Sequence, residues 1–451
     1  MEFFGRHVIP PTEMHLDLLQ FIATLTYAIH LAFVAMVIGG VGSAMWFTLA
    51  DSDKPNPRYA RFAEDLLRVF LRSRTAVLVL GILPIFALAF VHVQWFVGSN
   101  ATPLHYLPWI LVPVVLGFLV LFIYKRSFPS RKKNIRAHLG LGSLGVFLLL
   151  AAYFILMAIL SGLQDPERWF RLTGLGSMLL NWNAVWKFLF FLHASFAITG
   201  CAILLAFFRW PSTKIESGDA YAGLVRNYGA GLAFAFSFAM PVFYLLYVFT
   251  SPDVGMDNGV YLLAAGLMFA VLLAALMLFA NLRDQRSDRS SDRPSDRSGS
   301  DNGGERARFA TVAFGVFVVV FAVSSVIDQK TIANANQEHR RLLVIEAERR
   351  GVERQAELEA LVAGAVGTNR GEEIFKGQCM ACHRFDSKLV GPPLAQVLPK
   401  YKEDPEKLRA FVKSPYKINA DYPPMPALGL SDADAKSVAE YVLQELEKFQ
   451  Q

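Results

Sequence analysis

Cysteine and charge are both scarce in this chain. Three of its 451 residues are cysteine, too few for the disulfide framework of a small secreted domain. Charged residues make up 18%, against about 25% in soluble proteins, while hydrophobic residues reach 54%. This balance excludes an ordinary soluble globule, a disulfide scaffold and, for most of the chain, disorder.

Long apolar runs take the place of the missing charge. A run of about 20 apolar residues spans a bilayer as a helix. No Asp or Glu lies in any of these runs, and Lys187 is the only charged residue well inside one. Transmembrane strands are a poor alternative, because they need only about 10 residues and alternate in polarity. Eight helices are therefore predicted, at about residues 20–48, 75–97, 107–124, 139–162, 184–208, 227–250, 259–281 and 309–327.

Lys and Arg are unevenly distributed among the connecting segments. The rich segments are 51–74, 125–137, 209–226 and 282–308, whereas 98–106 and 251–258 contain neither residue and 163–183 has only Arg168 and Arg171. Cytoplasmic loops carry the excess of Lys and Arg, so both termini are predicted on the outer, periplasmic side of a bacterial inner membrane. The net charge of +6 then reflects topology, and nucleic acid is not an expected partner.

The same patterns divide the chain into domains. Residues 1–283 form a seven-helix membrane domain, and residues 309–327 form the eighth helix. Between them, segment 284–308 repeats Ser-Asp-Arg and has no large apolar residue, which predicts a disordered cytoplasmic linker. Residues 328–366 are predicted to be a periplasmic amphipathic helical spacer with a break at Gly351. Residues 367–451 form the last domain.

Cys379, Cys382 and His383 make a C-x-x-C-H motif, the attachment signal of a covalent c haem. Two thiols form thioethers with the haem, and the adjacent imidazole ligates the iron. The C-x-x-C part also suits zinc or a redox dithiol. Zinc would need further ligands, but no other Cys or His follows residue 339, and the βαβ context of a redox dithiol is absent. The motif therefore predicts haem c.

The flanks of this motif resemble the class I cytochrome c family over about residues 368–449. The similar positions are Gly371 and Phe375 before the motif, Gly391-Pro392 after it, and the Tyr-Pro-Pro-Met-Pro segment at 422–426. The resemblance implies that the Pro392 carbonyl orients His383 and that Met425 is the second axial ligand of the iron. Haem is attached to c-type cytochromes outside the cytoplasmic membrane, in agreement with the loop charges.

Three histidines lie within the predicted membrane helices. His30, His92 and His193 all fall in the outer half, at similar depth. An imidazole in a bilayer is costly without a partner, so each is a functional candidate; the alternative is a neutral histidine bonded to a neighbouring helix. Facing side chains build cofactor sites in helix bundles, so one or two b haems are expected, with these three as candidate axial ligands. Small residues that suit either a porphyrin or close helix packing are Gly39, Gly40, Gly42 and Gly200.

Two membrane segments are similar to subunit I of cytochrome bd-type quinol oxidases. They are Thr-Tyr-Ala-Ile-His-Leu-Ala-Phe at 26–33 and the segment 183–200 around Lys187 and His193. The resemblance implies haem ligation at the matching histidines. Those oxidases also carry buried glutamates for haem ligation and proton delivery, whereas the eight runs here contain no acid, and a long quinol-binding loop is not evident. Because dioxygen reduction consumes protons, this departure argues against an oxidase.

Together these features predict an all-α polytopic membrane bundle with a C-terminal class I cytochrome c domain. The expected function is electron transfer between the quinone pool or a partner subunit and an acceptor at the outer face, through haem c and haem b. Candidate partners are the membrane, quinone, soluble redox proteins and subunits of a respiratory complex, and quinol oxidation would make the protein an oxidoreductase. Two alternatives are a bd-like terminal oxidase subunit and a membrane anchor that tethers the cytochrome domain with no haem in the membrane.

Overall fold

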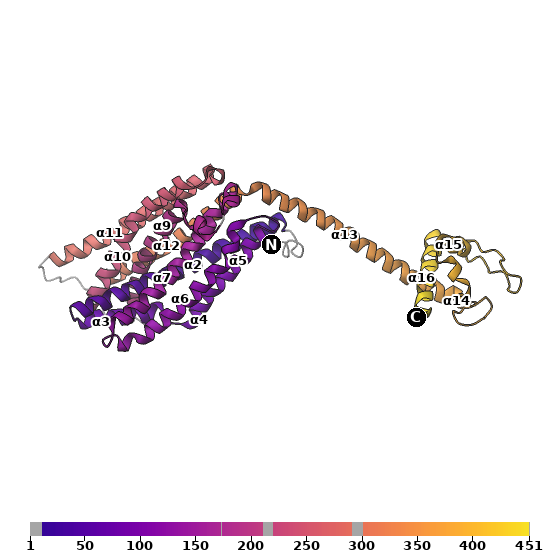
Figure 1. Cartoon of the computed structure of the whole chain (residues 1–451), viewed down its shortest axis with the longest axis horizontal. Coiled ribbons are helices and arrows are strands. Elements are labelled where there is room, and N and C mark those ends of the chain that lie inside the picture. Colours follow the sequence, from indigo (N-terminus) through magenta and orange to yellow (C-terminus); the bar gives the residue numbers. More distant parts are fainter. Residues whose placement is uncertain (1–10, 173, 211–219, 291–300, 451) are drawn as a thin grey trace. The chain divides into compact units, whose positions relative to one another are not determined.

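The computed structural model of this chain is built from helices (Figure 1). It describes residues 11–172, 174–210, 220–290 and 301–450, without the side chains of 281–290, 301–308 and 362–369. No strand occurs within these ranges. The chain divides into two compact units, Met1–Ala347 and Glu348–Gln451, and each is described by itself.

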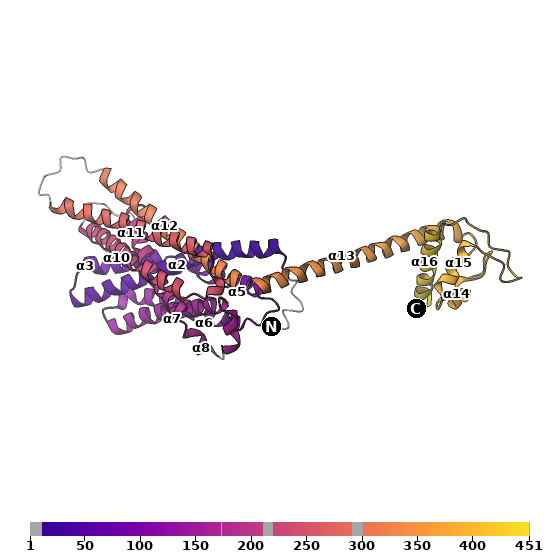
Figure 2. The same cartoon turned by 90° about the horizontal axis from the view of Figure 1, so that it is seen from above.

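Among the residues described, the first unit holds eight helices long and apolar enough to cross a membrane, as predicted. Their amphipathic character is weak because most of their faces meet either other helices or lipid. Figures 1 and 2 show them lying side by side as a bundle. They are α2 (Glu13–Asp53), the continuous span Arg74–Trp95 made of α4 (Arg74–Ala76), η1 (Val77–Ile82) and α5 (Leu83–Trp95), α6 (Pro108–Ser127), α7 (Ile135–Leu163), α9 (Trp182–Phe208), α10 (Ala220–Thr250), α11 (Asn258–Ser290) and α12 (Asp301–Ala335).

Helix α9 packs against α2, α7, α10 and α12 and forms the centre of this bundle. Its contacts are close because glycines stand where helices cross. A Cβ on Gly200 would lie 2.5 Å from the Gly229 carbonyl oxygen of α10, and a Cβ on Gly39 of α2 would overlap Thr199. Of the two roles considered for these small residues, the packing role is therefore the one that the structure displays.

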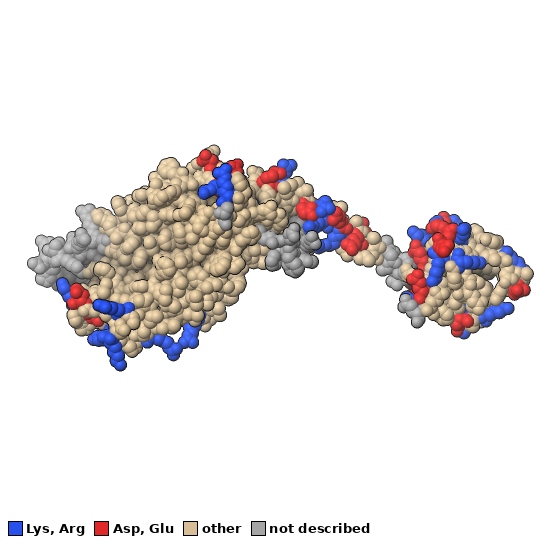
Figure 3. Space-filling model, in the orientation of Figure 1, with Lys and Arg blue, Asp and Glu red and all other residues tan. Residues whose placement is uncertain are grey.

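Two of the segments rich in Lys and Arg, 51–74 and 125–137, lie together at one end of the bundle. Helix α3 (Pro57–Phe70) follows α2 there and buries Phe62 and Leu66. The Lys125 ammonium at the end of α6 donates a 2.7 Å hydrogen bond to the Leu71 carbonyl, which joins segments 51–74 and 125–137. Figure 3 shows Lys and Arg side chains gathered at this α3 end on the face drawn. The clustering agrees with the predicted alternation of loops, and the orientation across a membrane stays a prediction.

Three predicted boundaries differ from the structure. Helix α12 continues past residue 327 to Ala335, so Asp328 belongs to the bundle and is buried there. Its carboxylate is stable in this position because side chains of neighbouring helices pair with it. Helix α13 (Gln337–Ile374) has no break at Gly351, since a helix tolerates one glycine at a cost of about 1 kcal/mol. Helices α11 and α12 extend into the predicted linker as far as Ser290 and from Asp301, and residues 291–300 lie outside the described part.

The second unit is a small helical domain. After α13 come η6 (Phe375–Cys379), α14 (Leu394–Val397), η7 (Pro399–Tyr401), α15 (Pro405–Lys413) and α16 (Asp432–Gln450). Helix α16 crosses the end of α13 closely, because a Cβ on Gly371 would overlap the Ser437 carbonyl. The Asp434 N–H donates to Ser431 Oγ at 3.1 Å and caps the start of α16. The core is formed by Ile374, Phe375, Leu394, Leu398, Leu408, Val438, Ala439, Val442 and Leu446.

Candidate functional site

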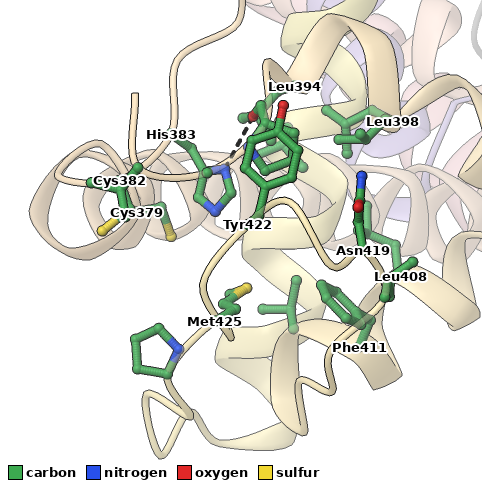
Figure 4. Close-up of a pocket in the computed structure, with 18 of the residues that line it drawn as sticks. Cys379, Cys382, His383, Leu394, Leu398, Leu408, Phe411, Asn419, Tyr422 and Met425 are labelled. Carbon is green, nitrogen blue, oxygen red and sulfur yellow. Dashed lines mark hydrogen bonds between the residues drawn. The ribbon is translucent and has the colours of Figure 1, made fainter. Parts of the chain in front are cut away.

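A cavity of about 400 Å³ opens inside the second unit. Five predicted site residues line it: Cys379, Cys382, His383, Pro392 and Met425. Figure 4 shows that His383 and Met425 come from different segments and face the same space, with the two cysteines beside His383. Most of the remaining wall is apolar, with Leu394, Leu398, Leu408, Phe411 and Val442 among its residues. The fold thus brings together sulfur and nitrogen donors that the sequence separates.

The C-x-x-C-H segment is wound into a tight turn at the end of η6. The N–H groups of Cys382 and His383 both donate to the Cys379 carbonyl, at 3.1 and 2.9 Å. The preceding turn is closed by the Met380 N–H, which donates to the Phe375 carbonyl at 2.9 Å. Two thiols and one imidazole are thereby held on a single short stretch of backbone at the cavity wall.

Gly391 and Pro392 support the imidazole of His383. The Nδ1–H of His383 donates to the Pro392 carbonyl at 3.4 Å, and the Gly391 N–H donates to the Cys382 carbonyl at 2.8 Å. A Cβ on Gly391 would overlap the His383 ring. A bond from Nδ1 defines the tautomer and the ring orientation, which makes Nε2 the nitrogen suited to bind a metal.

Met425 lies in the proline-rich loop at 422–426, which has no regular secondary structure. Its side chain is half-buried at the cavity, whereas that of Met380 points to solvent and is 47% exposed. The Lys388 ammonium lies 4.6 Å from the centre of the Tyr422 ring and ties this loop to the segment after His383. The loop thus presents a thioether to the same space as the imidazole.

This donor set fits haem better than zinc or a dithiol. Burial and the adjacent Cys382 raise the pKa of the Cys379 thiol, whereas a redox dithiol is activated by a lowered pKa. In the described part of the chain, no three His, Cys, Asp or Glu side chains are grouped to hold a metal ion. Two thiols, an imidazole and a thioether around an apolar cavity match the requirements of a covalently attached haem.

Comparison with known proteins decides the identity of the second unit. The family model described as Cytochrome c matches residues 368–445. Cytochrome c-551 of Azotobacter vinelandii is 42% identical over 77 residues, which cover 94% of that protein and 16% of this chain. The chain belongs to the cytochrome c family. Cytochrome c-552 of Hydrogenobacter thermophilus is 36% identical over 90 residues, or 92% of that protein and 19% of this chain.

Membership in this family implies a covalent haem c, electron transfer and an extracytoplasmic haem-binding domain. The match explains the local geometry, because the cavity, the C-x-x-C-H turn and the methionine loop all fall within residues 368–445. These matches do not extend into the membrane helices. The resemblance of those helices to cytochrome bd-type oxidases therefore stays a prediction.

Replacing Gly391 tests the support of the cytochrome c histidine. We expect Gly391→Ala to push the His383 ring out of place, because the added Cβ overlaps it, and to reduce the fraction of low-spin haem in absorption spectra. Gly377→Ala is the matched control, since a Cβ at Gly377 meets no atom within 4 Å. A Gly391→Ala protein with the spectrum of the wild type would show that the ring does not depend on this glycine.

His30 of α2 and His92 of α5 lie on two neighbouring helices, and both are near Tyr27 of α2. The Nδ1–H groups of His30 and His92 donate to the carbonyls of Leu80 and Leu88, at 2.8 and 2.7 Å. Tyr27 lies 6.1 Å from His92 between ring centres and lines a cavity of about 30 Å³ together with His30. The Nε2 atom of His92 is buried with no hydrogen-bond partner. Both rings are thus oriented by backbone bonds, as a haem ligand would be.

His193 of α9 lies in other surroundings. Its Nδ1–H donates to the Leu189 carbonyl at 2.8 Å, and its ring centre lies 5.5 and 4.6 Å from those of Phe236 and Phe243 in α10. Among the described residues, neither a hydrogen bond nor a ring contact joins it to His30 or His92. The 30 Å³ cavity beside His30 suits water rather than a porphyrin, which needs several hundred Å³. As packed, His30 does not fit haem b, and haem b at the three histidines stays a prediction.

Lys187 forms an ion pair with Asp328 that the sequence analysis missed. Only 3% of the Lys187 side chain and 8% of the Asp328 side chain are exposed. The eight apolar runs contain no acid, but α12 carries Asp328 into the bundle just beyond the end of the eighth run. Lys187, the one charged residue well inside an apolar run, is thus paired with a carboxylate from another helix. The available signal in the sequence was Asp328 itself, a charged residue directly after the eighth apolar run.

Proposed function

We propose that this protein is a membrane-bound electron-transfer cytochrome. Cys379 and Cys382 hold haem c covalently, while His383 and Met425 ligate its iron. One observation carries the proposal: all four side chains line a single apolar cavity of about 400 Å³. The bound haem supplies an iron that gains and loses one electron. The protein holds the imidazole through Pro392, presents the thioether and keeps water from the porphyrin faces.

The membrane helices give this cytochrome a fixed place at the outer surface of a bacterial inner membrane. The clustering of Lys and Arg at the α3 end supports a cytoplasmic position for that end, with both termini outside. Electrons then pass between a membrane donor, either quinone or a partner subunit of a respiratory complex, and an acceptor at the outer face. Oxidation of quinol by this route makes the protein a quinol:acceptor oxidoreductase.

Substitution of Met425 tests the sixth ligand. We expect Met425→Ala to lower the reduction potential of haem c by on the order of 0.1 V, because methionine ligation raises the potential and axial ligands span about 0.8 V. Met380→Leu is the control, because Met380 is the exposed methionine of the same domain. Potentiometric titration of both variants measures the effect. Equal potentials in Met425→Ala and the wild type would remove Met425 from the iron.

Haem stoichiometry tests the b haems that the sequence predicts. We expect pyridine haemochrome spectra of the wild type to show haem b beside haem c, and His193→Ala to lose one non-covalent haem per chain. His105→Ala is the control, since His105 is exposed in a loop turn. A c-type band alone would favour the membrane anchor. A band of d type or reaction with carbon monoxide would favour the oxidase. The earlier argument against an oxidase, that the membrane helices contain no buried acid, no longer holds, because Asp328 is buried in the bundle.

A further inference from the structure

Lys187 and Asp328 sit in a polar centre inside an otherwise apolar bundle. The Tyr247 hydroxyl of α10 donates to Asp328 Oδ1 at 2.9 Å. Gln164, at the end of α7, donates from Nε2 to the Tyr247 hydroxyl at 3.2 Å and to Thr331 Oγ1 at 2.9 Å. Four helices therefore contribute to one hydrogen-bonded group around a buried carboxylate. Ionisable residues inside a membrane are costly and usually serve a function.

A cavity of about 10 Å³ adjoins this ion pair, the size of one water molecule. Tyr27, Lys187, Ser325 and Asp328 all line it. The Tyr27 hydroxyl and Ser325 Oγ are buried with no hydrogen-bond partner, and Lys187 Nζ has none besides Asp328. Buried polar atoms in proteins are nearly always paired with protein or water. Several unpaired polar atoms around a space of this size point to a bound water.

The centre lies near the ends of its helices. Lys187 follows the start of α9 at Trp182, and Asp328 precedes the end of α12 at Ala335, so both are within about two turns of an end. Asn183 continues the polar group outward, because its Nδ2 donates to Ser251 Oγ at 2.9 Å just after the end of α10. A short row of polar side chains thus connects Asp328 with the end of the bundle opposite α3.

We propose that Lys187 and Asp328 form a hydrated proton-exchange site. A proton from the aqueous phase passes through the bound water to an oxygen of the Asp328 carboxylate, and the centre changes from net neutral to singly positive while Lys187 stays charged. The reverse transfer releases the proton. Within the described part of the chain, the other titratable side chains that interact electrostatically with Asp328 are Tyr27 of α2, Tyr153 of α7, and Tyr244 and Tyr247 of α10.

Such a site suits a membrane donor that releases protons together with electrons, as quinol does. This consequence rests on the proposed electron-transfer function, but the proton-exchange site itself does not. The test therefore avoids haem and quinone. Dicyclohexylcarbodiimide modifies carboxyl groups in their protonated form in apolar surroundings, so it reports whether Asp328 takes up a proton.

The experiment treats the full-length protein in detergent with this carbodiimide over a range of pH and locates the modified carboxyl by peptide mass. We expect modification of Asp328 to fall about tenfold for each pH unit above its titration midpoint. Asp257 is the internal control, because it is an exposed carboxylate paired with Lys330 at 2.7 Å and stays unmodified. A wild-type protein whose Asp328 is unmodified at every pH, or modified equally at every pH, overturns the proposal.

Two variants test the roles of the partners. Lys187→Met removes the cation, so Asp328 is expected to stay protonated and to be modified at all pH values. Tyr247→Phe removes a hydrogen bond to the Asp328 carboxylate but keeps Lys187 and Asp328 in place, so modification of Asp328 is expected to extend to higher pH. Elution as a single species in size-exclusion chromatography shows that each variant is folded. A pH profile of Tyr247→Phe that is unchanged or shifted to lower pH contradicts the proposal. Haem content, measured separately, shows whether the electron-transfer function fails independently.

Discussion

Replacement of Cys379 and Cys382 with serine is expected to abolish covalent haem attachment and to leave the cytochrome c domain unfolded. Thioether bonds need both sulfurs, so the chain made in a host competent for cytochrome maturation loses the mass of one haem. The domain then contains a cavity of about 400 Å³. At about 24 cal/mol per Å³ an apolar void of this size costs up to about 10 kcal/mol, comparable with the whole stability of a domain at about 5–15 kcal/mol.

Intact mass spectrometry after denaturation measures the covalent haem, and limited proteolysis measures the folding of the domain. Cys201→Ser is the matched control, because Cys201 is the third cysteine and is buried in α9 of the other unit. It is expected to keep the haem mass and a protease-resistant domain. A double variant that still carries the haem mass after denaturation would refute covalent attachment at these two positions.

Neutralising one member of the Lys187–Asp328 pair is expected to destabilise the membrane bundle by about 3–5 kcal/mol, because the other member is left buried without its partner and must either stay charged or give up its charge. Lys187→Met and Asp328→Asn should each show this loss. The double variant Lys187→Met/Asp328→Leu leaves no charge behind, and its free energy of unfolding is expected to fall much less than the sum of the two single changes.

Thermal unfolding in detergent, followed by circular dichroism, measures these differences. Lys330→Met is the control on the same helix, since Lys330 pairs with Asp257 at a partly exposed position and its loss should change the melting temperature little. Single variants with the same melting temperature as the wild type would show that neither residue depends on the other to be stable in the bundle. A double variant as unstable as the sum of the singles would show that the two residues act independently.

The haem c site was predictable because its chemistry is encoded locally. Cys379, Cys382 and His383 are nearly contiguous, so one turn of backbone brings them together whatever the rest of the fold. Pro392 and Met425 were assigned by resemblance to the cytochrome c family. In the structure both residues line the same cavity as His383, and the Pro392 carbonyl accepts a hydrogen bond from the His383 ring. The eight membrane helices were equally predictable from the sequence, because a helix that crosses a bilayer needs about 20 consecutive apolar residues.

The membrane histidines show where depth in a helix stops being informative. His30, His92 and His193 were grouped because they fall at similar heights, but height does not say which way a helix is rotated. The structure places Tyr27 beside the first two and phenylalanines of α10 beside the third. Rotation is set by contacts such as those of Gly39 and Gly200, which depend on the neighbouring helix rather than on the segment itself.

By itself, the order of residues determined the number of membrane helices and the haem-attachment turn, since each depends on properties of a single short segment. Only the tertiary structure decided that Asp328 is a buried residue and Lys187 its partner. These two lie on helices far apart in the chain, and hydropathy excludes a charge from an apolar run without regard to what faces it. A buried carboxylate is stable only where packing supplies the opposite charge and the hydrogen bonds, and packing is a property of the whole bundle.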